Sequence, residues 1–582
     1  MPIFQCLNVF GATIFLTTLN PTLDPVLAQA VTPNQIPEQI PTIQEPQKVP
    51  STLPPKEEPI LEPPSIETIP PEMHEENKLT FRVKRFVFEG NTIFNNEQLE
   101  AVVAPFTGRE ITLSELLEAR TAVTNFYVER GYITSGAFLP VKGNQTIKPN
   151  GAVVTIQIVE GKLEKINIIG GSRLQNYILS RLPNPNEVIN KNRILEALHL
   201  LQLDPLFETI SSELIEGSSL DESLLELKIK ERKPFKIEAI LDNYRSPASG
   251  SFQRRVELTH ANLLGLGDRL SLGYRNTNGS NTATASYSIP VNSQNGTVQF
   301  FWANSSANII ERPFSSLDIL SDARAYELTF RQPILRRATD KTFYEFALGL
   351  TASRLESESS IDNTPYPLTS GADSQGRTRI SAVRFFQEWI KRDIKGALLL
   401  HSQFNLGIGA LDATINNSAP DGRFFAWQGQ AAWLRRLTSD TTLVARANLQ
   451  LADRPLAALE QISLGGATTV RGYRENSFVT DNGFLLSTEL RIRAWAGEGG
   501  ELQVIPFFDF GTAWNNDGAN LSETEEFTGT LASVGLGLQY QLSDRFNARL
   551  DWGVPLFSID TNTDSRTWQE NGVYFSIGYR LF

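Results

Sequence analysis

From Phe235 to Phe582 the chain is a succession of strand-length segments in which polar and apolar residues alternate. On Leu502–Trp514, even positions carry Val504, Phe508, Phe510 and Trp514, whereas odd positions carry Gln503, Asp509 and Gly511, with Ile505 and Phe507 as apolar exceptions. Side chains of a strand point alternately to its two faces, so each such segment has one apolar and one polar face. We count roughly sixteen segments of this kind, which predicts an all-β unit over residues 235–582.

Alternation suits both a soluble β-sandwich and a β-barrel in a membrane, and three features favour the barrel. The apolar faces carry aromatic residues near strand ends, and the polar faces carry charges of both signs, as a water-filled lumen requires. The connections also differ: Ser543-Asp544 is a short turn, but about 25 residues separate the strands around Leu350 and Ile380. Sixteen strands leave roughly 22 residues each, enough for a tilted strand of about ten residues plus a connection. We therefore expect a 16-stranded transmembrane barrel, wide enough for an aqueous channel.

Composition excludes little else. The net charge is -12, and no basic run suggests a nucleic-acid partner. Hydrophobic residues make up 41% of the chain, and no stretch after residue 30 is apolar enough for a spanning helix. A membrane barrel would have the same composition as a soluble protein, because its strands never build a long apolar run.

The N-terminal region predicts export. Residues 1–30 read as a secretory signal, with an apolar run from Val9 to Leu16 and the small-x-small site Ala28-Gln29-Ala30, although the first Lys or Arg is Lys48. The only cysteine, Cys6, would leave with this segment, so the mature chain would hold no disulfide and no thiol chemistry. Residues 31–76 are rich in proline and predict an extended linker, either a plain spacer, which we favour, or a docking arm.

Two similar units are expected between the linker and the barrel, over residues 78–160 and 161–233. In the first, a strand at Phe81–Phe88 precedes a helix from Thr112 to Glu129 and a strand at 151–159. The second has a strand at 163–169, a helix at 190–203 and a strand at 224–229. Repetition of strand–helix–helix–strand–strand predicts two small α+β domains whose sheet edges can accept an added strand from a partner.

No catalytic or metal-binding pattern is visible. The four histidines, His74, His199, His260 and His401, are isolated and fit no ligand spacing. No glycine loop of the kind that cradles phosphate precedes a helix. We therefore expect a protein that is not an enzyme and that uses no metal or cofactor.

The sharpest local signal is Val470-Arg471-Gly472-Tyr473, in the sixth long connection of the predicted barrel. A second is Phe507-Phe508-Asp509-Phe510-Gly511, an F-x-D-x-G pattern on the thirteenth predicted strand. With these two motifs the chain resembles the two-partner secretion transporters, the haemolysin secretion/activation branch of the POTRA-barrel superfamily of outer-membrane assembly and secretion proteins. The VRGY tetrapeptide in the sixth external loop and the F-x-D-x-G segment are hallmarks of that superfamily.

Other stretches support this narrower branch, and the resemblance covers residues 78–582. Gly131-Tyr132 to Leu139-Pro140 and Val159-Glu160-Gly161 resemble its first POTRA domain. Asp242-Asn243-Tyr244 and Asn262–Asp268 resemble its opening barrel hairpin. Two features depart from the family. Its members often begin with a helix that plugs the pore, where this chain is Pro-rich. The parity of Val573, Phe575, Ile577, Tyr579 and Leu581 also puts Phe582 past the lipid or on a bulge.

The residues and the resemblance together predict an ion pair that locks the sixth loop to the inside of the barrel wall. Parity puts Asp509 on the lumen face, and a loop too long for a hairpin could bring Arg471 to it, where guanidinium and carboxylate form a bidentate pair. The alternative is that Arg471 is a solvated loop charge. The resemblance implies that Val470, Arg471, Gly472 and Tyr473 form the loop-lock motif. It implies that Phe507, Asp509 and Gly511 form its partner on the barrel wall.

The function implied is secretion of an unfolded partner protein, a large β-helix-type adhesin or haemolysin, through an outer-membrane barrel whose POTRA domains lie in the periplasm. Further expected partners are outer-membrane lipid and the barrel-assembly machinery that inserts this chain, which we expect to be a monomer. Two alternatives remain open at this point. One is a POTRA-barrel assembly factor that inserts other barrels; the other is a passive porin, which would need no recognition domains.

Overall fold

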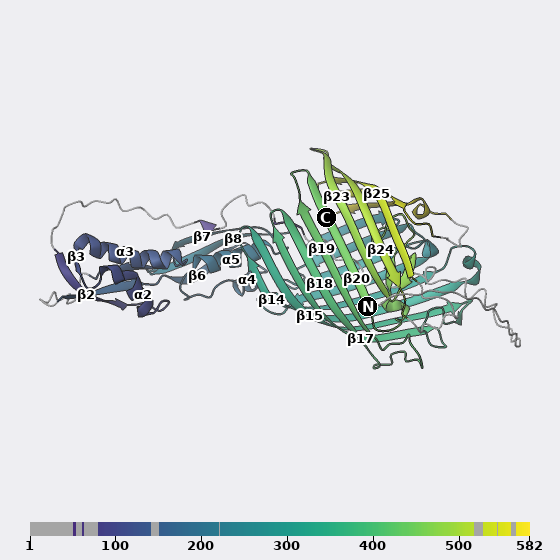
Figure 1. Ribbon diagram of the computed structural model, residues 1–582, viewed down its shortest axis with the longest axis horizontal. Helices are drawn as coiled ribbons and strands as arrows, with labels where there is room; N and C mark the ends of the chain where they lie inside the picture. The colour runs from purple at the N-terminus through teal and green to yellow at the C-terminus, as the bar shows by residue number, and fades with distance from the viewer. Residues whose placement is uncertain are drawn as a thin grey trace, which may run out of the picture.

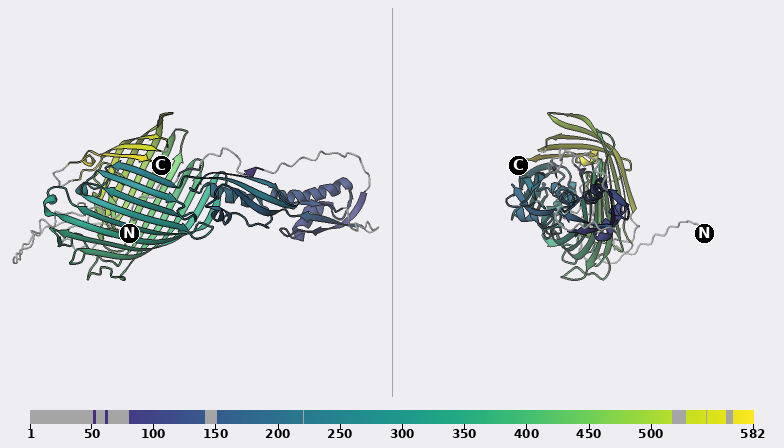
Figure 2. Two further views of the ribbon diagram at one scale, coloured as in Figure 1. Left: turned by 180° about the vertical axis from the view of Figure 1, so that it is seen from behind. Right: turned by 90° about the vertical axis from the view of Figure 1, so that its left-hand side faces the viewer.

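A computed structural model describes residues 51–53, 61–62, 80–140, 151–219, 221–516, 528–543, 545–559 and 566–582. Two small α+β units follow one another as an arm at one end of a large β-barrel (Figure 1). Viewed from the arm side, the arm lies in front of the ring of strands (Figure 2, right). The expected signal segment and most of the expected linker lie outside the described residues. Among the described helices, none combines the length and the apolar character needed to cross a membrane.

The first unit packs two helices on one face of a four-stranded sheet with the order β3-β2-β5-β4. Both helices begin with a capping box, from Asn95 with Gln98 and from Thr112 with Glu115. Their apolar sides meet the sheet in a core that includes Leu99, Val123 and Tyr127. The elements are β2 (Thr80–Glu89), α2 (Asn96–Val103), η2 (Ala104–Phe106), β3 (Glu110–Thr112), α3 (Leu113–Glu129), β4 (Gly136–Phe138) and β5 (Ala152–Val159).

The second unit repeats this order of strand, two helices and two strands. Its elements are β6 (Lys162–Ile169), α4 (Gln175–Leu179), α5 (Lys191–Gln202), β7 (Phe207–Glu216) and β8 (Glu222–Glu231). Strand β8 lies between β6 and β7, and β1 (Leu61–Glu62) pairs in parallel with the outer edge of β7. The two units touch where Lys191 N donates to Gly131 O at 2.8 Å.

Two short stretches of the predicted linker make contacts. Besides β1, the segment 51–53 lies against the barrel: Leu53 is 5% exposed, and its N–H donates to Asp393 O at 3.1 Å. Arg392 Nε donates to Ser51 O at 2.6 Å. An extended chain has unpaired backbone groups, so it can bind a sheet edge or a strand end that it passes. These residues therefore do more than span a distance.

The barrel is closed, and sixteen strands form its wall, as predicted. All neighbours are antiparallel, and β27 pairs with β9 to close the ring. The strands are β9 (Phe235–Asp242), β10 (Gln253–Ala261), β11 (Arg269–Asn276), β12 (Ser280–Pro290), β13 (Thr297–Asn308), β14 (Ile319–Ala338), β15 (Thr342–Ile361), β17 (Arg377–Asp393), β18 (Gly396–Ile408), β19 (Phe425–Arg436), β20 (Thr441–Ala452), β23 (Asn482–Gly497), β24 (Gly500–Trp514), β25 (Thr528–Leu542), β26 (Phe546–Pro555) and β27 (Val573–Arg580). The two-residue β16 (Thr364–Pro365) only extends the β15 edge.

Strand length differs from the expectation of about ten residues each. Strands β14 and β15 have 20 residues, and β17 has 17, so this hairpin extends well beyond what a membrane requires. The connection expected to hold about 25 residues is therefore shortened to residues 362–376. Cross-strand pairing continues above the membrane because polar residues such as Ser357 and Arg379 can still alternate on a solvated hairpin.

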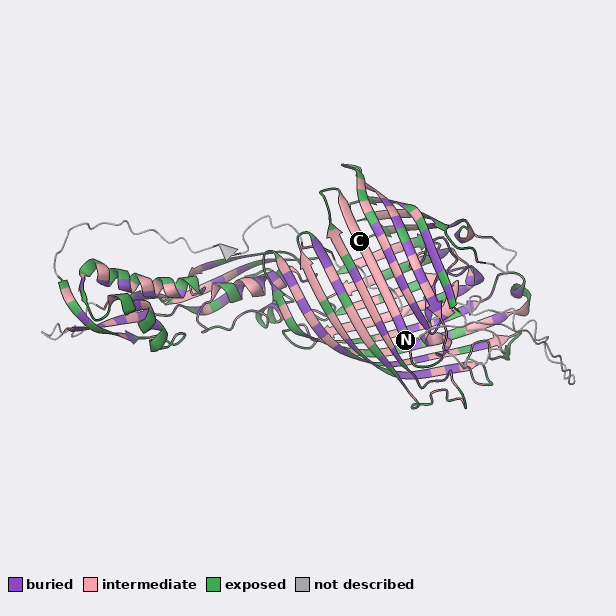
Figure 3. Ribbon diagram, viewed as in Figure 1, coloured by how far each residue is buried: buried purple, intermediate pink, exposed green. Residues whose placement is uncertain are grey.

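The outer face carries apolar residues such as Leu328 and Trp552, which are exposed. Figure 3 shows that many positions along the barrel strands are exposed or half-buried. Trp389, Trp433 and Trp495 stand near the arm-side ends of their strands and are 37%, 44% and 48% exposed. Aromatic side chains at this level mark the boundary between lipid and water. Phe582 lies beyond the end of β27, as parity predicted, and its ring lies 6.4 Å from that of Phe235.

Candidate functional site: a loop pinned inside the barrel

The connection between β20 and β23, residues 453–481, is the sixth loop on the side away from the arm, and we call it the inward loop. It contains η5 (Ala458–Glu460) and a small hairpin of β21 (Ile462–Leu464) and β22 (Phe478–Thr480). The hairpin tip carries the VRGY tetrapeptide, where Val470 is 0%, Arg471 3% and Tyr473 5% exposed. A loop this deeply buried lies in the lumen, not in solvent above the barrel.

Arg471 and Asp509 meet in a two-pronged ion pair. Nε of Arg471 donates to Asp509 Oδ2 at 2.7 Å, and Nη2 donates to Oδ1 at 2.9 Å. The backbone N–H of Arg471 also donates to Oδ2, at 3.2 Å, and Ser487 Oγ donates to Oδ1 at 2.7 Å. Asp509 is 0% exposed. Both oxygens of the carboxylate are thus saturated, which is what a charge without water needs.

Further charged side chains of the wall surround this pair. Arg471 Nη1 donates to Glu489 Oε1 at 3.0 Å and lies 3.5 Å from Asp551 Oδ1. Arg549 Nη2 reaches the same Glu489 oxygen at 2.7 Å, and Arg491 Nη2 donates to Glu489 Oε2 at 2.9 Å. The loop arginine therefore completes a network in which Glu489 and Asp551 each pair with at least two guanidinium groups, so its removal would unbalance more than one pair.

Phe507 and Gly511 shape the wall on which the tip rests. The Arg471 guanidinium lies 3.4 Å from the centre of the Phe507 ring, within the range of a cation–π contact. A Cβ at Gly535 would lie 2.2 Å from that ring, so glycine on β25 makes room for it. A Cβ at Gly511 would lie 3.0 Å from Val470 Cγ2, so this glycine admits the valine of the loop motif.

Gly472 and Tyr473 fasten the tip to the last strands. Gly472 has φ +96°, and its N–H donates to the Tyr574 hydroxyl at 3.1 Å. A Cβ there would lie 3.2 Å from the Gly553 carbonyl carbon, against the backbone of β26. The Tyr473 hydroxyl lies 2.9 Å from Ala532 O and 3.0 Å from Phe557 O. Every residue of the tetrapeptide thus contacts the barrel wall or the strands next to it.

The sequence predicts the pairing of Arg471 with Asp509 but indicates no role for Glu489, Asp551 or Tyr574. The alternation of their strands puts Glu489 and Asp551 on the lumen face, as it does Asp509, so the signal is present in the sequence. What was missing was the register, which sets Glu489 opposite Phe507 and Ser487 opposite Asp509. Cross-strand register follows from pairing over the whole barrel and cannot be read from one strand.

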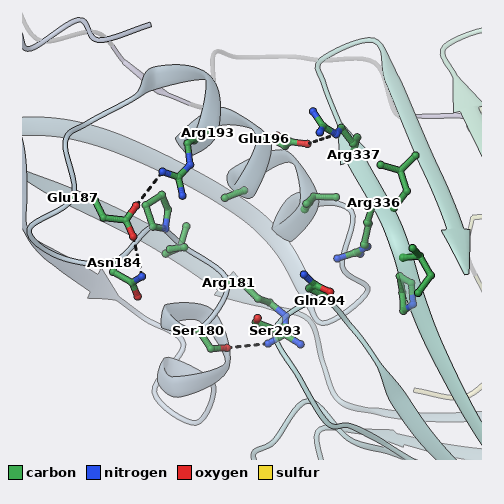
Figure 4. A pocket seen from close by; sticks show the side chains of 17 residues that line it. Ser180, Arg181, Asn184, Glu187, Arg193, Glu196, Ser293, Gln294, Arg336 and Arg337 are labelled. Atoms are coloured by element: carbon green, nitrogen blue, oxygen red, sulfur yellow. Dashed lines mark hydrogen bonds and ion pairs between the residues drawn. The ribbon is translucent and has the colours of Figure 1, made fainter. Parts of the chain in front are cut away.

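A second feature is the junction between the arm and the barrel, which encloses a pocket of about 460 Å³ (Figure 4). Arg181 of the second unit reaches the β12–β13 turn, where its Nε and Nη2 donate to Asn295 Oδ1 at 3.0 and 2.8 Å. Arg337 at the end of β14 lies 3.9 Å from Glu196 of α5. Asn295 can accept from two guanidinium nitrogens at once, so the arm is fastened to this turn by a directional contact.

Within the described residues, no cluster of three or more His, Cys, Asp or Glu side chains could hold a metal ion. The charges described above pair with one another.

A closed sixteen-stranded barrel with a two-unit α+β arm and a loop turned into its lumen defines the POTRA-barrel class of outer-membrane transporters. Residues 221–540 match the family model described as haemolysin secretion/activation protein ShlB/FhaC/HecB, and residues 81–161 match a POTRA domain of ShlB type. The family model covers more than half of the chain, and the chain belongs to that family.

Relatives along most of the chain agree. The outer membrane transporter CdiB of Dickeya dadantii is 24% identical over 78% of this chain and 78% of its own length. The heme/hemopexin transporter protein HuxB of Haemophilus influenzae is 23% identical over 80% and 82%. A solved structure, CdiB from Escherichia coli, has a TM-score of 0.66 at 22% identity and covers 88% of this chain and 93% of that one.

The chain is therefore an outer-membrane transporter of the two-partner secretion type, which exports a partner protein, and its POTRA arm lies in the periplasm. The alternative of a barrel-assembly factor is not supported, because the family model and the curated relatives belong to the secretion branch. The alternative of a passive porin does not account for the POTRA arm.

Proposed function

We propose that the inward loop is the gate of this transporter and that its POTRA arm captures an unfolded partner by strand addition. The observation that carries the gate is the buried Arg471–Asp509 pair, which holds a loop of the external side inside the lumen. A chain passing through the same lumen must displace that loop. The energy of the pinned loop therefore sets how readily the channel opens.

The arm offers exposed strand edges for capture. In the second POTRA unit, the β7 edge pairs with the chain's own Leu61–Glu62, opposite Ser212 and Glu213, at two positions among the described residues, and an incoming strand would replace this pairing. Backbone groups on an edge strand give affinity to an extended peptide with little demand on its sequence. This favours recognition of an unfolded chain, for which we propose a large secreted protein of the β-helix adhesin or haemolysin type.

We further propose that a monomer suffices, since one barrel holds both the gate and the conduit, and that the barrel-assembly machinery inserts it among outer-membrane lipids. No step in this function is chemical. Folding of the partner outside the cell would give export its direction, because a folded chain cannot return through the pore.

Capture at the β7 edge can be tested by cysteine crosslinking, because Cys6 is the only cysteine of the chain. Glu213→Cys places a thiol on β7, at the position that pairs with Glu62 and that an added strand would occupy, and Lys228→Cys places one on β8, inside the same sheet. A partner stalled by a folded C-terminal fusion and carrying cysteines near its N-terminus should crosslink to Cys at 213 and much less at 228. Equal crosslinking at both positions would reject strand addition at β7.

Deletion of residues 78–232 tests the arm as a whole. Export of the partner should stop while the barrel still inserts, which heat-modifiable migration on gels would report. Normal export by the deleted chain would show that recognition lies elsewhere.

A further inference from the structure

Near its start, the inward loop makes a second contact with the barrel wall, separate from the contact that its VRGY tip makes. Leu456 and Ala457, near the start of the loop, are 1% and 0% exposed. They pack in one cluster with Leu355 of β15, Ile380 and Ala382 of β17 and Ala426 of β19. The tip instead rests on β23 to β26. The inward loop thus contacts two regions of the barrel wall. One is formed by β15, β17 and β19, and the other by β23 to β26.

The region formed by β15, β17 and β19 contains a buried ion pair of its own. Arg384 of β17 donates from Nη2 to Glu460 Oε1 at 2.7 Å and from Nη1 to Oε2 at 3.0 Å. Both side chains are 2% exposed, and Arg384 is among the largest fully buried side chains. Asn405 Oδ1 accepts from Nη1 at 2.9 Å. This geometry is bidentate and dry, the arrangement in which loss of one partner costs most.

A second carboxylate lies beside this pair and has an oxygen that can still accept a hydrogen bond. Glu327 of β14 lies directly across from Ser353 of β15, whose hydroxyl accepts from Arg384 Nη2 at 3.4 Å. Glu327 interacts electrostatically with Arg384, yet its Oε1 is buried and has no hydrogen-bond partner. A buried carboxylate oxygen without a partner is unusual and calls for an explanation. Glu327 could receive the guanidinium if Glu460 moved away.

We propose that Arg384 is a positioning residue that forms a second anchor of the inward loop through Glu460 and passes to Glu327 when the loop leaves the lumen. This inference rests on the proposed gating role of the loop and adds its regulation. Opening requires two separate ion pairs to break, Arg471–Asp509 and Arg384–Glu460. Arg384 stays on the wall when Glu460 leaves with the loop, so it needs a resident substitute, and Glu327 is the carboxylate placed to supply one.

Thiol accessibility in the full-length transporter separates the two anchors. Ala457→Cys reports whether the base of the loop leaves the wall, because this position is buried in the closed state. Glu460→Gln keeps the shape of the side chain but removes its charge. It should raise the rate of labelling of Cys at 457 by about tenfold or more, since a buried pair broken at one partner loses several kcal/mol. Arg471→Ala should leave that rate nearly unchanged.

Glu358→Gln, an exposed carboxylate on β15, makes the same change of charge and should alter nothing. Heat-modifiable migration shows which variants have folded. If Glu460→Gln leaves Cys at 457 protected, the second anchor is wrong. If it exposes Cys at 457 but changes neither pore conductance in planar bilayers nor partner export, the anchor stands and the proposed gating role of the loop fails.

Glu327 has its own test. Glu327→Gln should leave Cys at 457 protected, because the closed pair does not need it. In single-channel records it should shorten each opening several-fold, since Arg384 would be left without a partner in the open state. Open times equal to those of the unaltered transporter would remove Glu327 from the mechanism.

Discussion

At the scale of single residues, the tip of the inward loop depends on the fork of Arg471 more than on its charge. Two guanidinium nitrogens engage both oxygens of Asp509 while a third engages Glu489. A lysine ammonium carries the same charge but cannot make this planar set of contacts. Charge and geometry can therefore be separated by substitution.

Arg471→Lys should lower export of the partner to an intermediate level, and Arg471→Ala should lower it more than about tenfold. The alanine leaves Asp509 and Glu489 buried without their partner, at a cost of about 3–5 kcal/mol for a dry pair. Secretion of the partner, normalised to inserted barrel, measures the effect. Arg493→Ala, a partly exposed arginine on β23 that pairs with Asp440, serves as the control. Full secretion by Arg471→Ala would end the lock hypothesis.

Gly472→Ala tests the backbone of the tip without altering any charge. The residue adopts φ +96°, where a side chain costs about 1–2 kcal/mol, and the new methyl would press on the β26 backbone. We expect more frequent channel openings in planar bilayers, with Arg471 and Asp509 both intact. Gly499→Ala, in the short β23–β24 turn where glycine has no positive φ, is the matched control. Identical opening frequencies in the two variants would show that the tip tolerates the change.

At the scale of elements, the sequence predicted the order of strands and helices but not where the barrel strands end. Helix α3 begins after Thr112, as expected, because a capping box marks that residue. Strands β14 and β15 have no such signal: the same alternation continues from lipid into solvent, so nothing in Ser357 or Glu358 marks the membrane surface. The contacts of Leu53 were also beyond prediction, because a Pro-rich stretch carries no pattern that names its neighbour.

Glu160 holds the first POTRA domain together in a way that can be tested by pH. It accepts from Thr92 N and Ile93 N at 2.9 Å each and from the Tyr127 hydroxyl at 2.8 Å. Burial raises the pKa of Glu160, but these hydrogen bonds outweigh it and hold the pKa below the usual range. A carboxyl with a lowered folded-state pKa stabilises the fold above its unfolded pKa of about 4.3, and this contribution disappears as the pH falls.

We therefore expect the β2–α2 connection to lose protection from hydrogen exchange below pH of about 4.5, after correction for the intrinsic exchange rate. Glu160→Gln should lower protection by about 1–3 kcal/mol at neutral pH and make it nearly independent of pH. Exchange of the 90–95 segment in the full-length transporter, measured by mass spectrometry, provides the test. Glu118→Gln, on the same domain, is the control. A pH profile shared by both variants would contradict the role given to Glu160.

At the scale of the whole molecule, two patterns determine where a barrel side chain lies. One is the alternation along its strand, and the other is the pairing register across the sixteen strands. Alternation predicted the lumen face of Asp509, and loop length predicted that residues 453–481 could turn inward. The Arg384–Glu460 pair could not be predicted, because it joins a strand and a loop 76 positions apart in sequence. The alternation along β17 indicates the face on which Arg384 lies. Only the closed barrel, however, brings β17 beside the start of the inward loop.

The same parity predicts which wall positions the exported chain must pass. Ser271 of β11 lines a cavity of about 670 Å³ at the arm-side mouth of the barrel, together with Arg255 and Thr284. Its neighbour Leu272 also borders this cavity, but alternation turns the Leu272 side chain to the opposite face of β11, where it is 42% exposed. If the partner travels through the lumen, Ser271→Cys should react with a charged thiol reagent in the resting channel and become protected when a partner is stalled in transit.

Leu272→Cys should remain unreactive in both states, because lipid excludes a charged reagent from that face. Labelling in intact proteoliposomes, followed by mass spectrometry, distinguishes the two positions, which differ by one residue and by the face of one strand. A stalled partner that left Ser271→Cys fully reactive would mean that the chain does not pass this wall, and the conduit would have to be sought outside the lumen.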